Sequence, residues 1–254
     1  MRSTLFTIFG LKIRSYGLMM AVGFALGIWR AARISRKRYG IEPERVYDLA
    51  LVLLISGIIG ARAVFILLNP ATESWRDFPA VWQGGLSFHG GLALAMIAGY
   101  VYTRIAKLSY WKCGDLVAPS LAIGYAFTRI GCFLNGCCYG CPTTLPWGVR
   151  FVDEKTGLPT PPSHPTQLYA VAANLLIFWL LTRVERMNRK QGFVFVAYLG
   201  LYSIYRFLIE FLRSGFTAKP WALGLTQAQA VSLVVIAISA ILIATVYRRP
   251  AKAS

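Results

Sequence analysis

Seven long apolar stretches constrain this 254-residue chain more than any other feature. Each is close to the 20 or so residues that an α-helix needs to cross about 30 Å of hydrocarbon. Charged residues make up only 15% of the chain, against roughly 25% in ordinary soluble domains. The sequence therefore predicts an all-α integral membrane protein with about seven transmembrane helices. The predicted spans are residues 16–31, 46–68, 86–105, 115–134, 165–183, 192–213 and 222–247.

Lysine and arginine are distributed unevenly between the segments that join these spans. With the N-terminus outside, the inner segments contain sixteen of them and the outer segments eight, while Arg62, Arg129 and Arg206 lie within spans. Basic residues gather on the cytoplasmic side of membrane proteins, which predicts an outer N-terminus and a cytoplasmic C-terminus. This topology accounts for most of the net charge of +17 without a nucleic-acid partner. We expect one transmembrane domain over residues 1–254, with no cleavable signal peptide and an outer loop at about 135–164.

The segment that closes the fourth span combines an arginine, three glycines and four cysteines between residues 129 and 142. An arginine at membrane depth costs from about 3 to more than 10 kcal/mol, so Arg129 requires something that pairs with its charge. Gly131, Gly136 and Gly140 allow close backbone approach or positive φ around a polar head group. These features predict a ligand site. The alternative is a helix end with a snorkelling arginine and small-residue packing.

The sixth span carries four polar residues on one helical stripe: Tyr202, Arg206, Glu210 and Arg213. Glu210 can neutralise Arg206 at i+4, which leaves Arg129 to face an anionic ligand. Because Arg62 and Arg213 exceed what one glutamate can balance, we expect an anion, and guanidinium groups match a lipid phosphate. An internal structural salt bridge is the alternative.

One histidine and a group of cysteines are further candidates. His89 begins the third span, where an imidazole can accept a proton near neutral pH or serve only as a hydrogen-bond anchor. Four cysteines at the end of the fourth span could bind a metal, form a disulfide or pack as small apolar residues, and their spacing leaves all three open. They are Cys132, Cys137, Cys138 and Cys141.

At these residues the chain resembles the prolipoprotein diacylglyceryl transferase family, in family order over nearly its whole length. The matching segments are residues 13–19, 60–62, 87–91, 129–131, 135–136, 139–140, 164–169, 202–213 and 226–229. The most specific combination is the Arg129-Ile-Gly131 signature with His89-Gly-Gly91 before it and His164-Pro-Thr-Gln-Leu-Tyr169 after it. The family's seven spans and its outer N-terminus agree with the topology inferred from basic residues.

The resemblance implies transfer of a diacylglyceryl group from phosphatidylglycerol to the lipobox cysteine of a preprolipoprotein signal peptide, releasing glycerol 1-phosphate. It implies a bacterial cytoplasmic membrane with the active site toward the periplasmic side, and neither a metal nor another cofactor. The expected catalytic residues are His89, Arg129 and Arg206. The expected substrate-binding residues are Tyr16, Arg62, Asn135, Gly136, Gly140, Tyr202, Glu210 and Arg213.

Departures from the family pattern keep other functions open. Cys132 replaces the first Asn of the signature, Cys137 replaces its Glu, and Cys141 stands where an arginine is common. One alternative is a non-enzymatic lipid-binding or transport protein that uses the same arginines as a phosphate site. Another is a thiol-redox or metal-binding membrane protein built on the four clustered cysteines.

Overall fold

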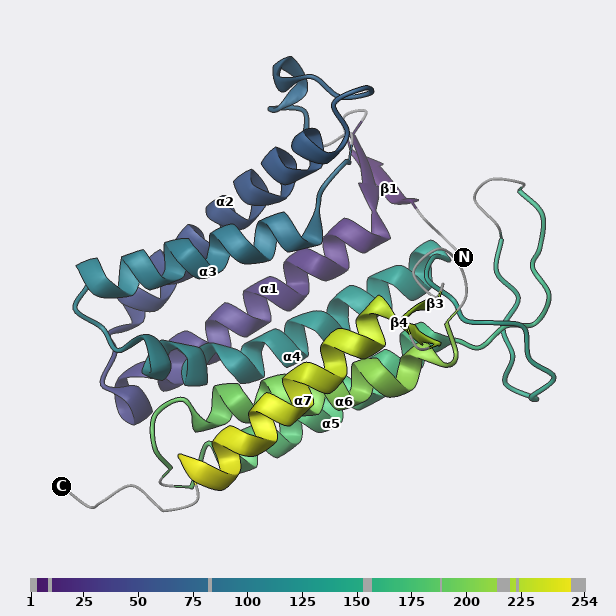
Figure 1. Cartoon of the computed structure of the whole chain (residues 1–254). Coiled ribbons are helices and arrows are strands. Elements are labelled where there is room, and N and C mark those ends of the chain that lie inside the picture. The colour runs from purple at the N-terminus through teal and green to yellow at the C-terminus, as the bar shows by residue number, and fades with distance from the viewer. Residues whose placement is uncertain are drawn as a thin grey trace. The chain divides into compact units, whose positions relative to one another are not determined.

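Seven long helices dominate the computed structural model, which describes residues 4–8, 11–81, 84–152, 157–187, 189–213, 220–222 and 224–247. Each overlaps one predicted span, so the prediction of a mostly helical membrane protein is confirmed (Figure 1). A π-helical turn, Ser35–Tyr39, and a 3-10 turn, Trp75–Asp77, add short pieces. The long helices are α1 (Ser15–Ile34), α2 (Pro43–Leu68), α3 (Phe88–Ile105), α4 (Tyr110–Asn135), α5 (Thr166–Val184), α6 (Phe193–Glu210) and α7 (Gln227–Thr245).

Six of these helices are long and apolar enough by composition to cross a membrane, and α3 falls outside that group. Helix α3 contains 18 residues, and His89 and Arg104 lower its hydropathy. Its outer surface is nevertheless a continuous apolar stripe at helical spacing, typical of contact with lipid. The exposed residues of the stripe are Leu92, Met96, Ile97, Val101 and Ile105.

Two short antiparallel hairpins were not predicted. Strands β1 (Thr4–Ile8) and β2 (Leu11–Arg14) precede α1, and strands β3 (Pro220–Ala222) and β4 (Leu225–Thr226) precede α7. Strands of two to five residues have too few alternating positions to give a recognisable pattern. Helix α7 then begins with a capping box, in which Thr226 and Gln229 each bond the other's backbone N–H.

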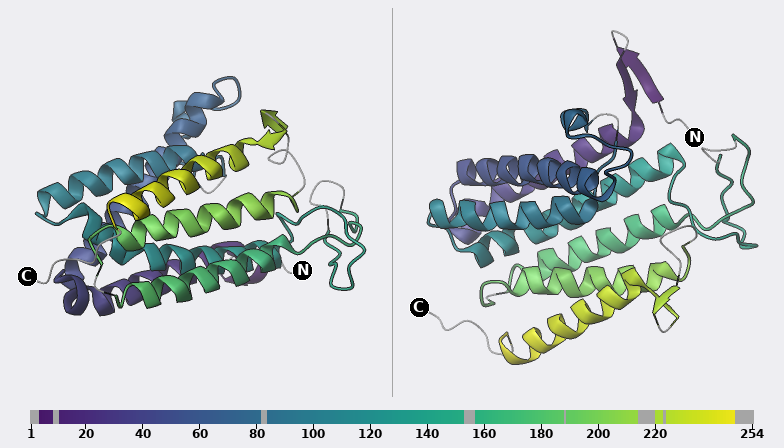
Figure 2. Two further views of the ribbon diagram at one scale, coloured as in Figure 1. Left: turned by 60° about the horizontal axis from the view of Figure 1, so that its bottom comes forward. Right: turned by 45° about the horizontal axis from the view of Figure 1, so that its top comes forward.

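The chain forms two compact units, Met1–Trp29 with Gly114–Ser254, and Arg30–Cys113. In the first unit, α4 to α7 run side by side (Figures 1 and 2). Its apolar core joins Ala118 and Ala122 of α4 to α5 and α6. The ends of α4 and α6 and the starts of α5 and α7 lie at the same end of this unit.

Small residues bring α1 and α4 close together in the first unit. A Cβ at Gly23 would lie 2.8 Å from the Cβ of Phe127, and one at Gly131 would lie 3.1 Å from the Cα of Tyr16. The Ser120 hydroxyl donates to the Gly27 carbonyl at 2.9 Å. In a lipid bilayer the hydrophobic effect does not hold helices together, so close packing and interhelical hydrogen bonds of this kind do. They fix Tyr16 beside the last turns of α4.

A buried carboxylate anchors the start of α6. Asp115 of α4 accepts hydrogen bonds from the backbone N–H groups of Gly192 at 2.6 Å and Phe195 at 2.8 Å. These N–H groups have no partner within their own helix, and the positive end of the helix dipole favours a nearby negative charge. Asp115 therefore fixes the helix that carries Arg206 and Glu210.

In the second unit, α2 and α3 cross at glycines. A Cβ at Gly60 would lie 2.6 Å from the Cβ of Leu94, and one at Gly90 would lie 2.5 Å from the Cβ of Val64. The N–H of Ser87 donates to the Ala61 carbonyl at 2.9 Å, which ties the start of α3 to α2. The glycine of the His89-Gly90 pair is therefore required for helix packing.

Candidate active site

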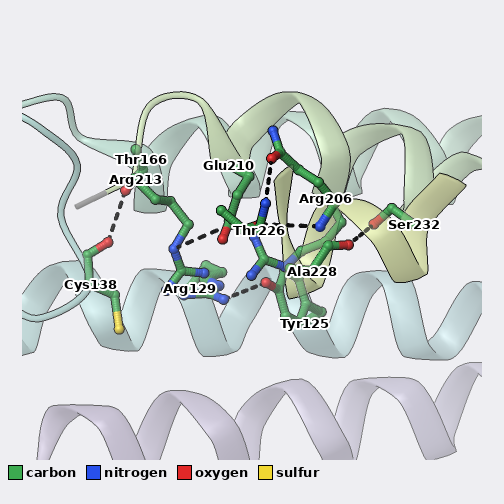
Figure 3. A network of polar contacts seen from close by, with 11 residues as sticks. Tyr125, Arg129, Cys138, Thr166, Arg206, Glu210, Arg213, Thr226, Ala228 and Ser232 are labelled. Carbon is green, nitrogen blue, oxygen red and sulfur yellow. Dashed lines mark hydrogen bonds and ion pairs between the residues drawn. The ribbon is translucent and has the colours of Figure 1, made fainter. Parts of the chain in front are cut away.

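Arg129 lies on α4, six residues before the helix ends, and faces the polar residues of α6 (Figure 3). Its guanidinium group donates to the Tyr125 hydroxyl and lies 4.8 Å from the centre of the Tyr125 ring. Among the described residues, no carboxylate lies within 4.0 Å of it, and its buried Nε has no hydrogen-bond partner. An arginine in this setting can accept an anionic ligand as its counter-ion.

Arg206, Glu210 and Arg213 form an ion-pair cluster at the end of α6. Arg206 donates to the fully buried Glu210 carboxylate, and the Nε of Arg213 lies 4.0 Å from the same carboxylate oxygen. The pairing of Arg206 with Glu210 at i+4 is confirmed. Two guanidinium groups thus share one carboxylate, which leaves an excess of positive charge.

Arg129 and Arg213 line a small pocket of about 10 Å³ together with Cys138, Thr166, Tyr205 and Ile209. Hydrogen bonds with Cys132 and Cys137, and then the charges of Arg129 and Arg213, lower the pKa of the Cys138 thiol. Even with Cys138 ionised, the three guanidinium groups exceed the two anionic groups by one charge. The pocket holds no more than a water-sized group, so a phosphate requires side-chain movement.

Tyrosine side chains surround the Arg129 end of this cluster. Tyr202 packs edge-on against Tyr125 with ring centres 5.5 Å apart, and Tyr205 lies 5.9 Å from Tyr202. Tyr125 also packs edge-on against Tyr205, with ring centres 6.4 Å apart. Tyr202 is therefore held in an aromatic group beside Arg129. Tyr16, at the start of α1, lies within electrostatic range of Arg129.

Gly136 ends α4 in a Schellman motif. Its φ is +81°, its N–H donates to Phe133, and the N–H of Cys137 donates to the Cys132 carbonyl. Asn135 is the last residue of α4 and lies directly before this turn. Gly136 and Asn135 thus shape the turn that follows Arg129.

Gly140 joins this turn to α6. It pairs with Arg213 in an isolated β-bridge, and its N–H donates to the His164 carbonyl at 2.9 Å. A Cβ here would collide with the Leu212 carbonyl and would lie 2.7 Å from Thr166 Cγ2. Only glycine fits this crossing.

We expect Gly140→Ala to destabilise the protein by about 1–3 kcal/mol, because backbone must move to accept the methyl group. Displacement of Arg213 should lower activity about tenfold. The matched control is Gly57→Ala, where the added Cβ would lie 4.0 Å from the Gly91 carbonyl oxygen. Thermal unfolding in detergent checks the first effect. Equal melting temperatures for the two variants would contradict it.

Arg62 and His89 belong to the second unit. Arg62 is 2% exposed, pairs with Glu73 at 3.0 Å and donates to the carbonyls of Asp77, Gly84 and Gly85. The expectation that Arg62 adds unbalanced charge is therefore wrong, since a second glutamate balances it. His89 is exposed at the start of α3 and packs edge-on against Phe88.

Sequence reasoning missed three residues of the first unit that support the site. Tyr125 holds Arg129 at i−4, a spacing that could have identified it. Gln167, which is fully buried, donates to the Cys137 carbonyl at 2.7 Å, and Thr166 donates to the Cys138 carbonyl at 2.8 Å. Both lie in the segment 164–169 that carried part of the resemblance.

Comparison with known proteins decides the family. The prolipoprotein diacylglyceryl transferase family model matches residues 3–245. This chain belongs to that family. Among curated phosphatidylglycerol–prolipoprotein diacylglyceryl transferases, those of Clostridium tetani and Symbiobacterium thermophilum are 35% and 36% identical to it. The alignments cover 84% and 95% of this chain, and 86% and 91% of those proteins.

Membership of the prolipoprotein diacylglyceryl transferase family agrees with the several membrane-spanning helices, so the chain is a multi-pass membrane protein. The matched range includes Arg129, the arginine–glutamate cluster of α6 and all four clustered cysteines.

Proposed function

We propose that this chain transfers the diacylglyceryl group of phosphatidylglycerol to the lipobox cysteine of a preprolipoprotein. The observation that supports this most is Arg129, a membrane-depth arginine with no carboxylate partner among the described residues, beside Arg206 and Arg213. The relatives named above carry the same activity in their names. The enzyme would act in a bacterial cytoplasmic membrane, crossing it seven times with its N-terminus and active site on the periplasmic side.

The reaction forms a thioether bond and breaks a carbon–oxygen bond. The lipobox thiolate attacks the carbon of the diacylated glycerol that bears the phosphate. The electrons of the broken carbon–oxygen bond leave with the phosphate oxygen. The product, glycerol 1-phosphate, carries one more negative charge than the phosphodiester did. Arg129 and Arg206 would stabilise this developing charge, with Glu210 orienting Arg206.

The remaining residues would bind and shape the substrate site. Tyr16 and Tyr202 would position the head group by hydroxyl hydrogen bonds, and Arg213 would contribute a further positive charge. Asn135, Gly136 and Gly140 would act through the turn that they build after α4. Arg62 would hold parts of the loop between α2 and α3 in place, since it bonds the carbonyls of Asp77, Gly84 and Gly85.

We expect His89→Gln to lower the transfer rate about thirtyfold at pH 7 if His89 accepts the thiol proton. A thiol of pKa about 8.5 is a few per cent ionised at that pH, which limits what a base contributes. The difference between wild type and variant should shrink toward pH 9, where the thiol ionises unaided. His164→Gln is the control and should keep the wild-type pH profile. Parallel profiles for His89→Gln and wild type would make His89 a positioning residue.

Glu210→Gln should cost less activity than Arg206→Ala, about tenfold. The neutral amide still accepts a hydrogen bond from Arg206 but no longer holds it by charge. Transfer rates of the two purified variants give the comparison. Complete loss of transfer in a folded Glu210→Gln protein would instead assign the carboxylate a direct chemical role.

The deciding experiment is expression of the chain in bacterial cells depleted of their own transferase. A preprolipoprotein should shift on a gel and acquire radiolabel from labelled phosphatidylglycerol. The same chain carrying Arg129→Ala, expressed at an equal level, is the control and should give neither.

Binding of phosphatidylglycerol vesicles without lipid transfer would favour the non-enzymatic lipid-binding alternative. The absence of both would remove the phosphate site altogether.

A further inference from the structure

Three cysteine thiols converge at the end of α4. Cys132 lies in the last turn of the helix, and Cys137 and Cys138 follow the turn at Gly136. Their Sγ atoms all lie within 4.8 Å of one another, and all three are free thiols. The proposed transfer does not use them, so the cluster requires a separate explanation.

The backbone holds these thiols together by several independent contacts. The Schellman turn folds Cys137 back over Cys132, and the Cys137 thiol lies 3.7 Å from the Cys132 carbonyl oxygen. Gln167 and Thr166 of α5 donate hydrogen bonds to the backbone carbonyls of Cys137 and Cys138, respectively. Cys138 has a φ of +65°, which a non-glycine residue adopts only at a cost in energy. The arrangement is therefore built by the fold before any ligand binds.

The spacing of the thiols suits a metal better than a disulfide. Two thiolates bound to Zn²⁺ at about 2.3 Å in tetrahedral geometry lie about 3.8 Å apart. A disulfide requires about 2.05 Å between its sulfurs and would leave the third thiol unused. Thiols within 4.8 Å of one another need only small rotations to reach a common metal ion.

Charge and access also favour a bound cation here. Three thiolates around Zn²⁺ carry a net charge of −1, which Arg129 and Arg213, both beside Cys138, can balance. Gln167 donates to the Cys137 carbonyl at 2.7 Å and so holds the backbone of this ligand, as an outer partner would. Cys132 is buried while Cys138 is exposed, which gives a metal ion a route of entry.

We propose that Cys132, Cys137 and Cys138 bind one Zn²⁺ ion, with the fourth coordination position taken by water or a small anion. Thiolate ligands select Zn²⁺ or Cu(I) over the harder cations. Each thiol releases one proton as its sulfur–metal bond forms, and no electron is transferred. The site goes beyond the proposed transfer activity, and its test does not depend on that activity.

The test uses Co²⁺ as a spectroscopic probe in the purified full chain, in detergent, with a phosphine reductant. One equivalent of Co²⁺ should give an intense thiolate-to-cobalt charge-transfer band, and one equivalent of Zn²⁺ should remove it. The band should weaken in Cys138→Ser and disappear when Cys132, Cys137 and Cys138 are all changed to Ser. The matched controls are Cys113→Ser and Cys141→Ser, which should keep the band.

Two results would overturn the site. One is the absence of a charge-transfer band in the reduced wild-type protein, a measurement that needs no variant to fold. The other is alkylation of protein isolated without reductant that finds two of the three thiols joined in a disulfide. A band that survives the triple substitution but is lost in Cys141→Ser would also refute this choice of ligands.

Discussion

Replacing Arg129 by alanine should lower lipid transfer at least about a hundredfold while leaving the fold intact. A single donor aimed at developing charge is worth about 10² to 10³ in rate. Arg129 has no carboxylate partner among the described residues, so its removal leaves no buried carboxylate unpaired. We therefore expect the melting temperature of Arg129→Ala to equal or exceed that of the wild type.

Two further variants sharpen this prediction. Arg129→Lys should recover little activity, because an ammonium group cannot reproduce the planar fork that matches phosphate oxygens. Arg150→Ala removes an exposed arginine from the loop after α4 and should transfer lipid at the wild-type rate. Near-normal transfer by Arg129→Ala would eliminate the phosphate role of this residue.

Replacing Arg206 by alanine should also lower transfer at least about a hundredfold, but with a loss of stability. Arg206 is the closest partner of the Glu210 carboxylate, which is fully buried and has Arg213 only at 4.0 Å. Breaking a buried ion pair typically costs about 3 to 5 kcal/mol, because one charge is left without compensation. The transfer rate and the free energy of unfolding should therefore both decrease in this variant.

The double variant Arg206→Ala with Glu210→Gln separates the two effects. It removes both charges, so stability should largely return while transfer stays low. If transfer returned with stability, Arg206 would be needed for folding alone. Measuring melting temperature and transfer on the same preparations distinguishes these outcomes.

The spacing of residues along the sequence was enough to predict contacts within a single helix. The positions of Arg206 and Glu210 at i and i+4 gave their ion pair directly, since residues at that spacing adjoin on any α-helix. Apolar length similarly located all seven long helices to within a few residues. The hairpins were missed because their pairing residues are too few to establish a period.

Contacts between separate elements were beyond the sequence. Glu73 reaches Arg62 from a loop after α2, and nothing in the order of residues distinguishes it from other acids. Gln167 bonds the Cys137 carbonyl across thirty positions. The four cysteines could be counted, but only the fold shows that three converge and that Cys141 is not among them.

The contact between Asp115 and the start of α6 matters for how loss-of-function screens are interpreted. Arg206 lies about 20 Å along the helix axis from Phe193, the first residue of α6, and Asp115 accepts hydrogen bonds from the N–H groups of Gly192 and Phe195 at that end. A helix released at one end can shift at the other, and a misplacement of about 1 Å costs catalysis heavily. Random mutagenesis would therefore recover Asp115 among inactive alleles, although it never touches lipid or peptide. A ligand-binding assay run beside the activity screen would distinguish Asp115 from the residues that contact substrate. It would identify Asp115 as a residue that holds Arg206 in position through α6.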